Sequence, residues 1–285
     1  MDKFGFVVLH YLAPEMTRRC VISLSESFPG MSIVVVDNAS PDGSGEALKK
    51  EFASIGNVTV ILNESNLGFA RGNNAGYDYL KRRGECRFTV VMNNDVVIDD
   101  PGFASKVESI YSETAFAVLG PDILNPLTGS HQNPAHLKAF TVQELESLRD
   151  KYSGYLRNFW WRRLKWNIKK AIFPAVAKDA AHASTHITER KEGVVLHGAC
   201  YIFSDRFTSA REYCFNPSTF MYFEEDILHF ECVRDGLKMV YDPSVRVLHY
   251  EDVSTNKAFG KGNRKDRFKF EHMGKSIDVL TGLMK

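Results

Sequence analysis

The chain has 285 residues and a formal net charge of +1, which argues against a dedicated nucleic-acid-binding protein. Its hydrophobic content of 44% and aromatic content of 12% supply a folded core and exclude a disordered chain. The five cysteines show no zinc-ligand spacing, so we expect reduced thiols rather than a disulfide framework.

The first part of the chain alternates strands and helices. Apolar runs predict strands over Phe4–Leu9, Ile33–Val36 and Val58–Leu62. Helices are expected over Pro14–Ser27 and from Glu46 to Phe52. This alternation is typical of an α/β fold with parallel strands.

A glycine- and asparagine-rich loop follows the third strand. Gly68 gives the backbone freedom to approach a ligand, and Asn73 or Asn74 can cap a helix that runs to about Arg83. A helix amino terminus favours anions, and the guanidinium of Arg71 suits a phosphate. The alternative is an ordinary helix cap beside a solvated arginine.

The segment 88–100 contains the clearest candidate for a ligand site. A buried strand over Phe88–Met92 breaks into Asn93, Asn94 and Asp95 before a second apolar run, Val96–Ile98. Polar side chains at the carboxyl end of a sheet strand are where open α/β sheets bind ligands. Oxygen atoms of Asn93 and Asp95 can hold a divalent cation. A plain polar turn is the alternative.

The middle of the chain changes character. Phe116–Leu119 predicts a short strand, and a polar loop with prolines follows over Pro121–Pro134. Residues 141–178 hold all three tryptophans, and 157–170 is basic without an acid. Such a helical insert either lies on an anionic membrane surface or packs on the domain with solvated lysines.

The last part of the chain returns to strands. His197 and Gly198 interrupt a strand over Val194–Phe203, where glycine permits close backbone approach. Three acids, Glu224, Glu225 and Asp226, open a helix that runs to about Asp235. They are either partners of the helix dipole or, beside an apolar wall, carboxyl groups with raised pKa values.

Two further strands are predicted over Leu237–Tyr241 and Val245–Leu248, the second ending at His249. A lone histidine at a strand end is more often structural than a ligand. The tail is expected to end in an amphipathic helix from about Arg264.

Five motifs in this order resemble the family 2 glycosyltransferases of the GT-A fold, most nearly the rhamnosyltransferase-like members that build bacterial surface polysaccharides. They are VVVDNASPDGS, NLGFARGNNAG, VVMNNDV, the Gly-Ala strand followed by FMYFEED, and VRVLHYED. The resemblance covers most of 4–125 and 194–255. It implies a mostly parallel central sheet flanked by helices, and the helical insert over about 141–178 has no counterpart in the shared motifs.

The resemblance also assigns roles to residues. Asp37 would hydrogen-bond the nucleotide base, and Asp95 would bind Mn²⁺ or Mg²⁺ with His249. The metal element here is Asn93-Asn94-Asp95, which lacks one acid of the family pattern. The nucleotide-sugar set is His10, Asp37, Asn66, Gly68, Arg71, Asn73, Asn93 and Asn94.

The family inverts configuration in one displacement, so a general base is expected and an enzyme nucleophile is not. Alignment on Gly236 favours Glu225 as the base, with Asp226 as second choice beside Glu224. The segment His197-Gly198-Ala199 resembles the one that shapes the acceptor side.

We therefore expect one domain over 1–255, with a nucleotide-binding half over about 1–125, an insert over about 141–178 and an acceptor half over about 194–255. A helical tail occupies 256–285. The expected donor is a dTDP- or UDP-sugar, and the acceptor a saccharide linked to polyprenyl diphosphate. The apolar stretch before Pro14 is too short for a signal peptide, and no apolar run of roughly 18 residues occurs, so we expect neither a signal peptide nor a membrane span. The expected location is cytoplasmic, with peripheral contact at the inner face of the cell membrane through 157–170.

Two rival functions are weighed against this one. A nucleotidylyltransferase would carry a glycine-rich basic loop after the first strand, where this chain has His10 to Ala13. A nucleotide-sugar or glycan binding module without catalysis is favoured by Asn93. The acids Asp95 and Glu225 favour the enzyme.

Overall fold

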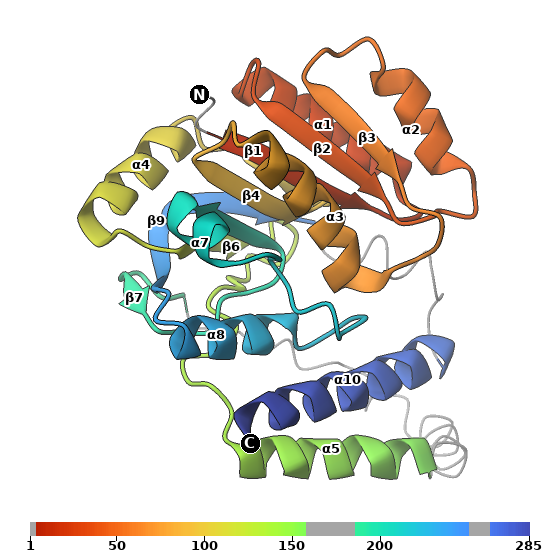
Figure 1. Ribbon diagram of the computed structural model, residues 1–285, viewed down its shortest axis with the longest axis vertical. Helices are drawn as coiled ribbons and strands as arrows, with labels where there is room; N and C mark the ends of the chain where they lie inside the picture. Colours follow the sequence, from red (N-terminus) through yellow and green to blue (C-terminus); the bar gives the residue numbers. More distant parts are fainter. Residues whose placement is uncertain (1–3, 158–185, 251–262) are drawn as a thin grey trace.

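A computed structural model describes residues 4–157, 186–250 and 263–285. Its centre is a nine-stranded sheet with the order β3-β2-β1-β4-β8-β6-β9-β5, and β7 pairs with β9 (Figure 1). The sheet is flanked by helices, as the sequence predicted. No described helix is long and apolar enough to cross a membrane.

The amino-terminal half of the sheet is parallel. It consists of β1 (Phe4–His10), β2 (Ser32–Asp37), β3 (Val58–Leu62) and β4 (Phe88–Asn93). Continuous apolar runs form these strands because helices cover both faces of the sheet. The helices between them are α1 (Pro14–Ser27), α2 (Ser44–Phe52) and α3 (Gly68–Arg83). Parallel strands bring their carboxyl ends to one edge.

The other half of the sheet is mixed. β8 (Cys200–Ser204) runs antiparallel between β4 and β6 (Val118–Leu124), and β6 is parallel to β9 (Met239–His249). The short strands β5 (Val96–Val97) and β7 (Lys191–Glu192) pair antiparallel with β9. The helices here are α4 (Phe103–Thr114), α7 (Asp205–Ala210) and α8 (Glu224–Arg234).

Several strand predictions were wrong in their bounds, and the strand predicted over Val194–Phe203 begins only at Cys200. The structure has one strand, β9, where two were predicted, and β6 continues through Pro121 to Leu124. The register of β6 against β9 shifts between Pro121 and Asp122, where Pro121 lies opposite Asp242. Proline has no N–H to donate to the neighbouring strand, and a bulge accommodates this gap in the hydrogen-bond ladder. The strands therefore bend at the prolines and do not end there.

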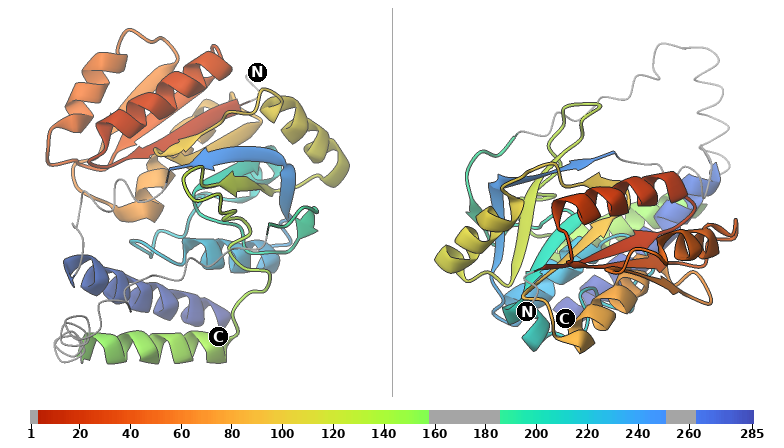
Figure 2. Two further views of the ribbon diagram at one scale, coloured as in Figure 1. Left: turned by 180° about the vertical axis from the view of Figure 1, so that it is seen from behind. Right: turned by 90° about the horizontal axis from the view of Figure 1, so that it is seen from above.

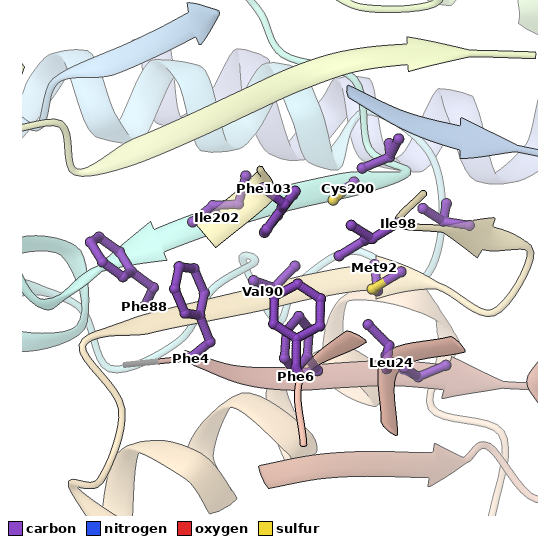
Figure 3. Close-up of a cluster of buried hydrophobic side chains, with 14 of the residues drawn as sticks. Phe4, Phe6, Leu24, Phe88, Val90, Met92, Ile98, Phe103, Cys200 and Ile202 are labelled. Carbon is purple, nitrogen blue, oxygen red and sulfur yellow. The ribbon is translucent and has the colours of Figure 1, made fainter. Parts of the chain in front are cut away.

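Each face of the sheet has its own hydrophobic core. One core packs the sheet against α1, α2 and α4, with Leu24, Phe52 and Phe103 among its buried residues (Figure 3). The other packs the sheet against α3, α7 and α8, through Tyr77, Phe207 and Leu228 among others. This double cover fixes the strands, and hence the polar residues at their ends.

A helix pair lies beyond the second face. α5 (Val142–Arg157) and α10 (Asn263–Met284) lie side by side in every view and contact α8 (Figures 1 and 2). Leu145, Ile227, Ile277 and Leu280 form their buried core, and Arg149 pairs with Asp278 at 2.6 Å. The predicted C-terminal helix therefore packs on the domain. The insert is described only over α5, and its three tryptophans lie outside the described residues.

Candidate functional site

Three strands place polar groups at one sheet edge. His10 ends β1 opposite Asp37 at the end of β2, and Asn93 at the end of β4 lies opposite Leu9. These side chains come from distant parts of the sequence but share the carboxyl edge of the parallel strands. Ligands of open α/β sheets bind at this edge.

His10 is a buried support within this edge. Its Nδ1 lies 2.7 Å from Thr17 Oγ1, and its Nε2 lies 2.9 Å from Ser44 Oγ and 3.8 Å from Asp37 Oδ1. Burial lowers the pKa of His10, although the Asp37 carboxylate acts in the opposite direction. The ring thus holds the first turns of α1 and α2 against the sheet.

Asp37 is held from its own loop. Its side chain is 3% exposed, and both carboxylate oxygens accept from the backbone N–H of Ser40, at 3.3 and 3.2 Å. A Cβ at position 45 would overlap the Asp37 carboxylate, so only glycine fits at Gly45. The loop is built around the position of this one acid.

The loop before α3 is organised by Asn38. The Nδ2 of Asn38 donates to Asn66 Oδ1 at 3.0 Å and to the Gly68 carbonyl at 2.9 Å. Gly68 has φ +79°, and a Cβ there would collide with the carbonyl of Phe220. The N–H of Phe69 donates to that same carbonyl at 2.6 Å. The loop is thereby joined to the segment that leads into α8.

The expected cap of α3 was wrong. The helix begins at Gly68, so Asn73 and Asn74 lie within it. Asn74 instead binds the backbone of Cys214 and Phe215. Asn73 is buried, donates to the Phe69 carbonyl, and leaves Oδ1 without a partner in the described structure. Arg71 is exposed, with its Nε donating to the Pro217 carbonyl at 2.7 Å.

The segment after β4 brings Asp95 to His249. Asp95 Oδ1 lies 3.3 Å from His249 Nε2, and both side chains are buried. The other ring nitrogen, Nδ1, lies 2.7 Å from Gln132 Oε1, which accepts its proton. In the neutral ring, Nε2 then carries the lone pair and faces a carboxylate oxygen that has no hydrogen-bond partner among the described residues.

This pair fits a divalent cation. Two lone-pair atoms side by side repel each other unless a proton or a metal ion lies between them. Carboxylate oxygen and imidazole nitrogen are both ligands of Mn²⁺. Asn94 is buried, and its Nδ2 donates to Thr17 Oγ1 at 3.0 Å. Asn93 is partly exposed, and its N–H donates to the Ala199 carbonyl at 2.9 Å.

The three acids at the start of α8 have different surroundings. Glu225 is partly exposed, and its Oε2 lies 4.0 Å from the Cβ position of Gly198. Asp226 lines an apolar pocket of about 120 Å³ with residues of α10. Burial, together with the neighbouring Glu225, raises the pKa values of Glu224 and Asp226 to about 8. Burial also raises the pKa of Glu225.

His197 connects these acids to the Asp95–His249 pair. Its ring centroid lies 6.0 Å from that of His249, and its Nδ1 accepts from the Ala199 N–H at 3.2 Å. Burial and the nearby His249 lower its pKa to about 4. Contacts thus run from Asp95 through His249 and His197 to Gly198 and Glu225.

Sequence reasoning missed three supporting residues: Thr17, Asn38 and Gln132. Asn38 directly follows Asp37 in the first motif, so its position beside an expected site residue could have indicated a role from the sequence. Thr17 bridges His10 and Asn94 from inside an ordinary helical pattern. Gln132 lies 117 positions from His249, and nothing local indicates the contact.

Comparison with known proteins gives a family match and structural neighbours. Residues 6–169, more than half of the chain, match the family described as "Glycosyl transferase family 2". No curated protein sequence matches significantly.

The neighbours include S. aureus TarS, at 13% identity and TM-score 0.53, covering 90% of this chain and 38% of that one. A structure of S. aureus TarS 1-349 has 15% identity, TM-score 0.50 and coverages of 85% and 60%. GalNAc-T7 with UDP, GalNAc and Mn²⁺ has 14% identity, TM-score 0.53 and coverages of 88% and 44%. The chain spans less than two thirds of each neighbour, and the likeness concerns the fold.

Proposed function

The chain belongs to glycosyl transferase family 2, and on that premise we propose that it transfers a sugar from a nucleoside-diphosphate donor with inversion at the anomeric carbon. The acceptor we propose is a bacterial surface polysaccharide, and rhamnose is the candidate sugar. The observation that carries the proposal is the line of contacts from Asp95 to Glu225. These contacts connect the pair proposed to bind a cation with the carboxylate of the proposed base. The space between them stays open at Gly198, because glycine has no side chain.

The donor is proposed to lie along the carboxyl edge of β1, β2 and β4. Asp37 would accept from the nucleotide base, and Asn93 would face the sugar or ribose. The loop that begins α3 would cover the nucleotide, with Arg71 near the phosphates. GalNAc-T7, which shares the fold, was crystallised with UDP and Mn²⁺, and this supports a uridine or related diphosphate donor.

Asp95 and His249 would hold a divalent cation, Mn²⁺ or Mg²⁺. Such an ion offsets the charge that develops on the departing diphosphate. Gln132 fixes the ring of His249 through Nδ1, so that Nε2 is kept as the ligand atom. One acid is missing from the family's metal element, and the imidazole supplies a further ligand in its place.

Glu225 would remove the proton of the acceptor hydroxyl. As the acceptor oxygen forms its bond to the anomeric carbon, the bond from that carbon to the diphosphate oxygen breaks, and the proton passes to the carboxylate. Partial burial raises the pKa of Glu225, which brings its basicity closer to working pH. Asp226 faces the pocket beside α10, so it is poorly placed for this role.

The acceptor side is proposed to include His197, Gly198 and Ala199. A saccharide linked to polyprenyl diphosphate would reach it from a membrane surface contacted by 157–170. That segment is basic and aromatic in sequence and lies almost wholly outside the described residues. Liposome flotation tests this part: a protein that stays in the soluble fraction with anionic vesicles has no such contact.

Thermal stability against a panel of nucleoside diphosphates, with and without Mn²⁺, tests the donor site. A ligand that binds only the folded protein raises the melting temperature by mass action. We expect a shift with dTDP or UDP that needs the metal and is lost in Asp95→Ala. No shift with any nucleotide would contradict the proposal. Donor hydrolysis that is lost in Glu225→Gln separates an enzyme from a binding module.

A further inference from the structure

A second cluster of metal-ligand side chains lies away from the Asp95–His249 pair. Asp122 on β6, His131 in the loop after it, and His186 before β7 offer ligand atoms within 4.8 Å of one another. Among the residues that the structure describes, no other group of three such side chains comes this close. The cluster joins segments that are far apart in the chain.

The first two residues form an oriented pair. Asp122 is 3% exposed, and its Oδ1 accepts from His131 Nδ1 at 2.8 Å. Because the proton is then on Nδ1, the lone pair of His131 is on Nε2. A histidine whose Nδ1 donates to a carboxylate is the usual form of a histidine that ligates a metal. The buried carboxylate also favours a cation nearby.

His186 supplies the second imidazole. Its ring is stacked on that of His131, with centroids 3.6 Å apart and planes 8° from parallel. In their neutral forms the two rings offer two nitrogen lone pairs to a shared ion. A metal ion lies in the plane of each ligating ring, so binding requires His186 to tilt. Its exposed position outside helices and strands permits this.

His186, the exposed member of the cluster, borders a hollow at the surface. His186 lines a hollow of about 490 Å³ together with Thr188, Arg190 and Asp242. Arg190 is paired with Asp242 at 2.5 Å, so the arginine charge is largely compensated. An ion can therefore arrive with water ligands and exchange some of them for imidazole nitrogen.

We propose that His131 and His186 bind a divalent transition-metal ion of the Zn²⁺ class, with Asp122 orienting His131, at a site distinct from the Asp95–His249 pair. Two imidazoles, one of them held by a carboxylate, favour Zn²⁺, Co²⁺ or Ni²⁺ over Mg²⁺. The ion ties the segment before β7 to β6. His131 is followed by Gln132, which holds His249, so this second ion stiffens the support of the first metal pair.

Co²⁺ alone is a suitable probe, because its visible absorption reports nitrogen ligation without any sugar transfer. The experiment uses the full chain carrying Asp95→Asn and His249→Ala, so that the first pair cannot contribute. We expect one Co²⁺ to bind, and Zn²⁺ but not Mg²⁺ to displace it. Adding His131→Ala should weaken Co²⁺ binding by about tenfold to a hundredfold.

His136→Ala is the matched control in the same background. His136 is partly buried, its ring packs on Phe140, and it is not one of the three clustered side chains, so Co²⁺ binding should be unchanged. Circular dichroism confirms that each variant is folded. No Co²⁺ absorption in the background protein, or the same absorption with His131→Ala, would overturn the inference. The experiment does not measure transferase activity. The metal-site proposal and the proposed function can therefore each be refuted without the other.

Discussion

The carboxylate of Glu225 faces Gly198 at 4.0 Å, measured from Oε2 to the Cβ position of that glycine. Gly198 lies outside the left-handed region, so its backbone accepts other residues. What the glycine provides is room in front of the proposed base. Two segments far apart in the sequence therefore share one space, and the predictions below start from it.

Gly198→Leu should fill this space. The new side chain would project toward Glu225 and exclude the acceptor, while the nucleotide edge at Asp37 is untouched. We expect the KM for the acceptor to rise tenfold or more, with an unchanged thermal shift from nucleoside diphosphate. Gly198→Ala, whose Cβ makes ordinary contact, is the control. A normal KM in the leucine variant would show that the acceptor binds elsewhere.

Glu225→Gln should lower kcat by roughly 10²–10⁴, the usual contribution of a general base. The amide keeps the size of the side chain, so donor binding should persist. Asp226→Asn is the comparison, since Asp226 faces the apolar pocket beside α10. Steady-state kinetics of both variants decide the assignment. If Glu225→Gln remains active and Asp226→Asn is inactive, Asp226 is the general base and Glu225 is not.

Gln132→Leu should weaken metal activation without removing a ligand. Gln132 Oε1 accepts from His249 Nδ1 at 2.7 Å and so keeps Nε2 toward Asp95. Loss of such a partner costs about 10–100-fold in metal affinity. The measurement is the Mn²⁺ concentration for half-maximal activity. Gln143→Leu, at an exposed position of α5, is the control, and equal Mn²⁺ requirements in both variants would refute the supporting role.

Gly45→Ala should disturb the nucleotide end of the site. Its Cβ would overlap the Asp37 carboxylate, which must move away. We expect a destabilisation of about 1–3 kcal/mol, typical of overpacking, and a nucleotide affinity about tenfold lower. Gly56→Ala adds the same methyl group where nothing lies within 4 Å. Calorimetric titration with nucleoside diphosphate compares the two, and equal affinities would mean that Asp37 does not contact the nucleotide.

The contribution of Glu224 and Asp226 to the stability of the protein should fall as pH rises from about 4 to about 8. The pKa values of Glu224 and Asp226 are raised from 4.5 and 3.8 to about 8, chiefly by burial. Across this window the unfolded chain releases protons that the folded chain retains, so unfolding becomes more favourable. The loss is on the order of a few kcal/mol.

Denaturant unfolding at a series of pH values measures this slope. Asp226→Asn keeps the neutral shape at every pH, so its curve should be flatter and the variant more stable near pH 8. Asp278→Asn, at an exposed acid of α10, should leave the slope close to that of the native chain, since it removes a surface ion pair. Identical slopes in Asp226→Asn and the native chain would refute the prediction.

Local pattern in the sequence was enough to predict most of the framework. The helix over Pro14–Ser27 and the strand over Val58–Leu62 have the predicted bounds, because apolar spacing is typical of each kind of element. The alternation of strands and helices also implied that Asp37 and Asn93 would share one edge, since parallel strands end together. Both inferences depend only on near neighbours in the chain.

Tertiary structure alone decided what each polar group contacts. Strand β9 continues past its proline because it remains paired with β6. A bulge opposite Pro121 accommodates the interruption of the hydrogen-bond ladder. Helix α8 turned Glu225 toward Gly198 and Asp226 toward α10, a difference that three adjacent acids cannot reveal. Gln132 reached His249 for the same reason. Contacts between distant segments are set by packing of the whole chain, whereas sequence pattern reports the backbone and burial near each residue.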